Sequence, residues 1–150
     1  MALPVYKTDV IDKVFFLRWD APPTPDEIQA VFQKMQTAYQ QHQQQQLVLV
    51  TSAGAKSAVP NSEQRRHLSN MLSDARALFS EIHVVIEGNE LQHNLQRVIV
   101  SGMLIVTRTY DDQFIRVHKN ADGAAGFIAR RLGVDGTQVV NEARSRGVVM

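Results

Sequence analysis

The fold is decided by residues 81–106, EIHVVIEGNELQHNLQRVIVSGMLIV. The apolar run at 82–86 predicts a buried strand, and Gly88 predicts a sharp turn after it. Asn89 stands where a helix cap belongs, and the predicted helix becomes wholly apolar from Val98. A strand that leads directly into a half-buried helix is typical of an α/β domain.

Length and composition indicate one globular domain. At 150 residues the chain can bury a substantial core, and its 44% hydrophobic and 21% charged residues are ordinary for such a domain. The net charge of +1 gives no general electrostatic reason to expect nucleic acid as a partner. The absence of cysteine excludes disulfides, thiol catalysis and cysteine-ligated metals.

The N-terminus and the apolar runs predict a cytoplasmic protein. Residues 1–9 lack the basic region and apolar stretch of a signal peptide. The longest apolar run, Val98–Val106, has about half of the roughly 20 residues that a membrane-spanning helix needs. We therefore expect no membrane span.

The first part of the chain predicts a β-hairpin and a helix. Two β-prone runs, 5–11 and 14–19, are separated by a short turn that lacks glycine. Thr24 can then cap a helix, with Pro25 in its first turn and Glu27 completing a capping box. The apolar face of this helix is predicted to consist of Ile28, Val31, Phe32, Met35 and Tyr39.

A second strand and helix follow the glutamine-rich segment 40–46. We interpret that segment as a solvated helix end, with an interaction segment as the alternative. The apolar run 47–50 predicts a central strand covered on both faces, and 51–60 predicts a loop. Asn61 and Gln64 form the next capping box. The core stripe of this helix is predicted to be Leu68, Met71, Leu72, Ala75, Leu78 and Phe79.

The last third predicts a short strand at 114–117 and two helices. Asn120 is expected to cap the first helix, Gly133 to end it and Asp135 to start the second. The first helix is predicted to bury Ala124, Phe127, Ile128 and Leu132. The tail 147–150 is expected to be frayed or held by a partner.

The loop 52–57 lies where a phosphate-binding loop would lie, but its sequence does not fit one. The Walker pattern requires glycine at the positions of Val50 and Ala55. Pro60 also separates Lys56 from the helix start that would bind the phosphate. We therefore predict no nucleotide cofactor, and no Gly-x-Ser-x-Gly pattern supports a serine nucleophile.

The histidines and arginine pairs give few further candidates. No histidine pair has the helical spacing of a zinc site, so we interpret all of them as structural or surface residues. These are His42, His67, His83, His93 and His118. Arg130 and Arg131 suit the C-terminal end of a helix. Arg65 and Arg66 lie in the first turns of theirs, where the helix dipole does not favour cations. They are candidates for contact with an anionic partner, with a solvated helix face as the alternative.

The predicted order β-β-α-β-α-β-α-β-α, with a short terminal helix, resembles the STAS fold of anti-sigma-factor antagonists. It is more closely similar to the small bacterial proteins described as STAS-like or STAS/Sec14-like. The resemblance covers residues 5–133 and is carried by segments 60–66, 83–86 with the helix that follows, and 121–132.

The resemblance implies an α/β domain with a mixed sheet of about five strands, spanning residues 1–133. Residues 134–150 would then form a helical extension of the same domain. The terminal helix could cover the domain's own core or pair two chains into a homodimer.

The resemblance also implies a non-enzymatic protein-interaction or regulatory module. Sporulation-type antagonists carry a phosphorylated serine after an aspartate, whereas this loop has no such pair. The candidates for partner binding or a phosphoswitch are Ser52, Ser57, Arg65 and Arg66. The alternative is a domain that binds a small hydrophobic ligand or lipid, with Val98–Val106 lining the cavity.

Overall fold

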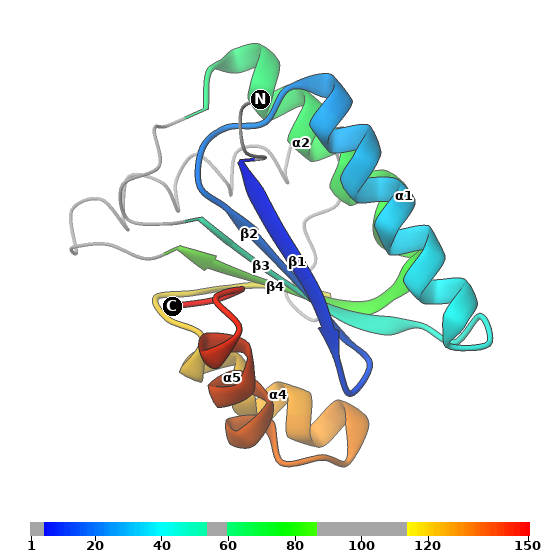
Figure 1. The fold of residues 1–150 in the computed structure, drawn as a ribbon, viewed down its shortest axis with the longest axis vertical. Helices are drawn as coiled ribbons and strands as arrows, with labels where there is room; N and C mark the ends of the chain where they lie inside the picture. Colours follow the sequence, from blue (N-terminus) through cyan, green and yellow to red (C-terminus); the bar gives the residue numbers. More distant parts are fainter. Residues whose placement is uncertain (1–4, 54–59, 87–113) are drawn as a thin grey trace.

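The structure is a computed structural model, and it describes residues 5–53, 60–86 and 114–150. A mixed sheet runs through its middle. Its five strands lie in the order β1-β2-β3-β4-β5. β1 is antiparallel to β2, and each later neighbouring pair is parallel. This confirms the predicted α/β fold with an N-terminal hairpin and a C-terminal helix (Figure 1).

The strands are β1 (Tyr6–Ile11), β2 (Val14–Trp19), β3 (Leu47–Ala53), β4 (Phe79–Ile86) and β5 (Ile115–His118). The helices are α1 (Pro25–Gln41), α2 (Ser62–Ala75), α4 (Asp122–Leu132) and α5 (Gly136–Ser145), with a short 3₁₀ turn at Arg76–Leu78.

The β1–β2 hairpin closes without glycine. Asp12 and Lys13 adopt positive φ angles of 47° and 63°, as a two-residue turn between right-twisted strands requires. The backbone carbonyl of Lys13 accepts a hydrogen bond from the amide of Val48 at 3.0 Å. The turn is thereby tied to the central strand.

The capping residues that the sequence indicated begin three of the helices. Thr24 and Asn61 each form a complete capping box, and Asp135 accepts a hydrogen bond from the amide of Gln138. The prediction for Asn120 was wrong in register, because Ala121 occupies the cap of α4. The carboxamide oxygen of Asn120 still accepts a hydrogen bond from the Gly123 amide at 3.2 Å. Gly133 ends the helix with φ 69°, as predicted.

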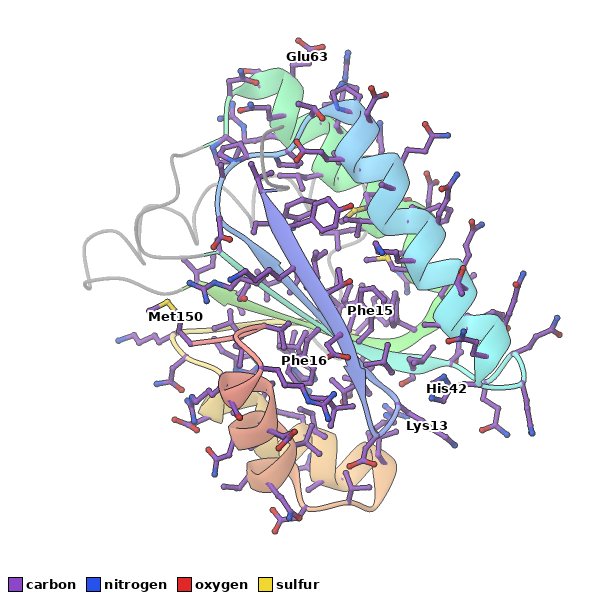
Figure 2. The ribbon with its side chains drawn as sticks, in the orientation of Figure 1. Lys13, Phe15, Phe16, His42, Glu63 and Met150 are labelled. Carbon is purple, nitrogen blue, oxygen red and sulfur yellow. The ribbon has the colours of Figure 1, made fainter. Side chains whose placement is uncertain are left out.

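The sheet divides the core into two layers. Figure 1 shows α1 and α2 on one face, while α4 and α5 cover the other. Successive residues of β2 point to opposite layers, so Phe15 packs beneath α1 and Phe16 packs towards α5 (Figure 2). The same alternation holds on β4 and β5, so polar residues two apart on these strands face the layer that contains α4.

Two predicted element boundaries were wrong. Leu78 and Phe79 were assigned to the helical stripe, but the chain has left α2 by Arg76, and Phe79 begins β4. Residues 51–53 were assigned to a loop, but they extend β3 because they pair with both neighbouring strands. Apolar residues suit either element, so their period could not locate these boundaries.

The C-terminal tail is part of the core and is not frayed. Val148 and Val149 are buried in the same apolar cluster as Val139, Val140 and Ala143 of α5. These five side chains, which suggested a homodimer, are thus covered by their own chain, whereas Met150 is exposed. The glutamine-rich segment, in contrast, is exposed from Gln43 to Gln46, as a solvated helix end should be.

Some sequence predictions lie outside the described residues. These are the turn at Gly88, the helix from Asn89, the apolar run Val98–Val106, and Ser57. Among the helices that the structure describes, none is long and apolar enough to cross a membrane.

Candidate anion-binding site

Charged and polar side chains gather where α4 crosses β4 and β5. Glu81 and His83 are two residues apart on β4, and Arg116 and His118 are two apart on β5. Strand pairing aligns His83 with Arg116 and Val85 with His118. Because side chains alternate along a strand, all four polar side chains project to the α4 face.

His83 and His118 form a hydrogen-bonded pair. Nδ1 of His83 lies 2.9 Å from Nε2 of His118, and His83 is completely buried. His118 lies against the start of α4, where a Cβ on Gly123 would come within 2.8 Å of its Nδ1. The missing side chain of Gly123 therefore leaves room for the His118 ring.

Glu81 joins this pair to α4. One carboxylate oxygen lies 3.2 Å from Nε2 of His83, and the other lies 3.6 Å from Nε of Arg131. The first contact is too poorly aligned for a full hydrogen bond, so we interpret it as mainly electrostatic. Burial acts to raise the pKa of Glu81, but His83 and Arg131 outweigh it and hold that pKa below its ordinary value.

The charge of Glu81 influences which ring atom of His83 carries hydrogen. An ionised carboxylate only accepts, so it favours the form of His83 with hydrogen on Nε2, the nitrogen that lies 3.2 Å away. Nδ1 then accepts from His118 when His83 is neutral, and donates to it when His83 is charged. Both protonation states keep the 2.9 Å hydrogen bond between the rings.

His118 is kept uncharged at neutral pH. Burial, electrostatic repulsion from the neighbouring His83 and the charge on Arg116 together lower the pKa of His118 to about 4. The unfolded chain therefore binds more protons than the folded chain between the ordinary value of 6.5 and about 4.

We expect the free energy of unfolding to fall as the pH drops from about 6.5 to about 4 and to be level above this range. Glu81 adds a further loss only below its ordinary pKa of 4.5. Urea unfolding at a series of pH values measures the slope. His118→Gln should flatten it above pH 4.5, whereas His67→Gln on α2 should leave it unchanged. An unchanged slope in His118→Gln would contradict this assignment.

Phe127 of α4 forms an aromatic wall beside the two rings. Its centroid lies 5.4 Å from that of His83. The guanidinium groups of Arg116 and Arg130 lie 4.3 Å and 5.5 Å from the Phe127 centroid. Nε of Arg116 is buried and has no hydrogen-bond partner among the described residues. Arg116 thus holds a desolvated donor at the wall of the site.

A pocket of about 420 Å³ opens beside this wall. It is lined by Glu81, Arg116, Phe127, Arg130 and Arg131. Three guanidinium groups face one carboxylate, which leaves two unbalanced positive charges in a chain whose net charge is +1. An anion is the ligand that this charge distribution favours.

Among the described residues, no group of three histidine, aspartate or glutamate side chains could hold a metal ion. In the same part of the chain, no hydroxyl hydrogen-bonds to His83 or His118.

The three candidate residues from the sequence that the structure describes lie elsewhere. Ser52 is buried in β3, and its hydroxyl has no partner among the described residues. Arg65 folds back to donate to the Pro60 carbonyl at 3.0 Å and to the Ser62 hydroxyl at 3.1 Å. Arg66 is exposed on α2. None of these residues lines the pocket.

Sequence reasoning interpreted His83, His118, Arg130 and Arg131 as structural or surface residues and so missed the site. One signal was available. Glu81 and His83 place polar groups on one face of an otherwise apolar strand, and Arg116 and His118 repeat that pattern on the next strand. Polar residues on the inner face of a buried strand need partners. Here Glu81 contacts His83 and His83 hydrogen-bonds to His118, whereas Nε of Arg116 has no partner among the described residues.

Comparison with known proteins adds no relationship: no family model, curated protein or solved structure matches the chain. The STAS-like resemblance therefore stays a prediction from the order of elements.

Proposed function

We propose that the protein is a non-enzymatic interaction module that binds an anionic group of a partner protein in the pocket beside Phe127. The observation that carries the proposal is the convergence of three arginines from β5 and α4 on one concave site. The regulatory role implied by the STAS-like resemblance is compatible with such a module, and we keep it as part of the proposal.

The arrangement supports binding in two ways. Arg116 is stacked on Phe127 and half-buried, so little side-chain freedom is left to lose when it binds. Arg130 has no ion pair among the described residues, and it is exposed at the rim. Guanidinium groups match carboxylates and phosphates through paired hydrogen bonds.

The buried contacts that join His118, His83 and Glu81, here called the buried relay, support the site. Glu81 engages Arg131 through Nε, and the two terminal nitrogens of that guanidinium have no ion pair among the described residues, so they can meet a ligand. His83 in turn contacts Glu81 and keeps the carboxylate from standing alone in the core. The relay therefore positions Arg131 and does not itself contact the anion.

The proposal predicts saturable binding of inorganic sulfate, measured by equilibrium titration at constant ionic strength. Arg116→Gln should weaken the affinity about tenfold or more, since a charge-assisted hydrogen bond contributes about 1.5–3 kcal/mol. Arg130→Gln should weaken it less, because Arg130 is exposed and its interaction is screened.

Arg66→Gln is the matched control, since it removes one exposed arginine from α2 and should not change sulfate affinity. Unfolding curves show whether each variant keeps its fold. The proposal fails if wild-type protein binds no sulfate, or if Arg66→Gln weakens binding as much as Arg116→Gln.

A further inference from the structure

We propose that the anionic group is a phosphate monoester bound as its dianion. The inference rests on the proposed function and narrows it from any anion to one chemical class. It follows from the charge count, the burial and the arrangement of the same five pocket residues.

The charge of the pocket matches a dianion. Arg116, Arg130 and Arg131 carry three positive charges against the single negative charge of Glu81. A carboxylate would balance only one of the two remaining charges. A phosphate monoester has a second pKa near 6 and carries close to two negative charges at neutral pH.

The position of the arginines also favours phosphate. Arg116 comes from β5, whereas Arg130 and Arg131 come from the last turn of α4. Donors that approach from separate elements suit the three oxygens of a tetrahedral group better than the flat pair of oxygens on a carboxylate. Phe127 holds the Arg116 guanidinium at 4.3 Å and so fixes one of these directions.

The buried donor of Arg116 adds to this preference. Its Nε has no partner among the described residues, and a buried donor without a partner is costly. An oxygen-rich ligand in the pocket would offer an acceptor to this guanidinium. A phosphate keeps spare acceptors for it after meeting Arg130 and Arg131.

The test compares O-phosphoserine with L-serine O-sulfate at about pH 8, where the phosphate is fully dianionic and the sulfate ester carries one charge. The two ligands share the serine frame and a tetrahedral head group, so they differ chiefly in charge. We expect phosphoserine to bind about tenfold more tightly or better, a difference of about 1.4 kcal/mol. Arg130→Gln should shrink this preference, and Arg66→Gln should preserve it.

A capped phosphoserine peptide separates the two sources of such an ester. Tighter binding of the peptide than of free phosphoserine assigns the ester to a phosphorylated protein segment. Equal affinities assign it to a free metabolite, which supports the phosphate ester but contradicts a partner protein as its source. Equal binding of phosphoserine and the sulfate ester overturns this inference but leaves the anion-binding module standing. Binding of neither ester, nor of inorganic sulfate, overturns the module as well.

Discussion

Replacing His83 by alanine is expected to lower the free energy of unfolding by about 3 kcal/mol or more. His83 is fully buried and touches Glu81, His118 and Phe127 at once. Its loss leaves a cavity, removes the nearest partner of a buried carboxylate and strips His118 of its 2.9 Å hydrogen bond. Urea unfolding at neutral pH measures the change.

His67→Ala provides the control for this substitution. His67 lies on α2, and its one ion pair among the described residues is with the exposed Glu63, at 3.6 Å, so its loss should cost less than about 0.5 kcal/mol. Glu81→Gln in the His83→Ala background should restore part of the stability, because it removes the stranded charge. A loss below 1 kcal/mol for His83→Ala would show that the buried relay is not a structural unit.

Gly136→Ala is expected to destabilise the protein by about 3 kcal/mol. Gly136 is the buried first residue of α5, and a Cβ there would overlap the backbone carbonyl of Ala125 on α4. A backbone atom cannot swing away as a side chain does, so the two helices would have to separate. Since α4 carries Phe127, Arg130 and Arg131, this variant should also weaken sulfate binding.

Gly126→Ala is the matched control within α4. Gly126 is exposed, and a Cβ there would meet nothing within 4 Å. Alanine is a better helix former, so this variant should gain about 0.5–1 kcal/mol and keep its affinity for sulfate. If α4 and α5 pack as described, thermal or urea unfolding should show changes of opposite sign in the free energy of unfolding for Gly136→Ala and Gly126→Ala. Equal effects of the two substitutions would contradict that packing.

Local signals in the sequence accounted for most of the fold. The Thr24 and Asn61 capping boxes and the Asp135 cap each fix a helix start through contacts that span three residues. The apolar run at Leu47–Val50 could be placed in the centre of the sheet because both of its faces are buried. Such features can be predicted from the sequence because each depends on residues that are close together in the chain.

The site could not be predicted in the same way, because it depends on pairing between two strands that are far apart in the sequence. His83 and His118 are 35 residues apart, and only the parallel register of β4 and β5 brings them together. Arg131 reaches Glu81 through the packing of α4 on the sheet, which no local pattern encodes. The buried tail at Val148 and Val149 was missed for the same reason, since its partners lie on the sheet and α5.

The NMR response of the arginine side chains to sulfate tests the proposed anion site most directly. We expect the Nε–H signals of Arg116, Arg130 and Arg131 to shift together and to saturate with one dissociation constant. Arg65 and Arg66 on α2 should stay unmoved in the same titration. Shifts at Arg65 and Arg66 with none at the pocket arginines would contradict the proposed pocket and place the binding surface at the start of α2.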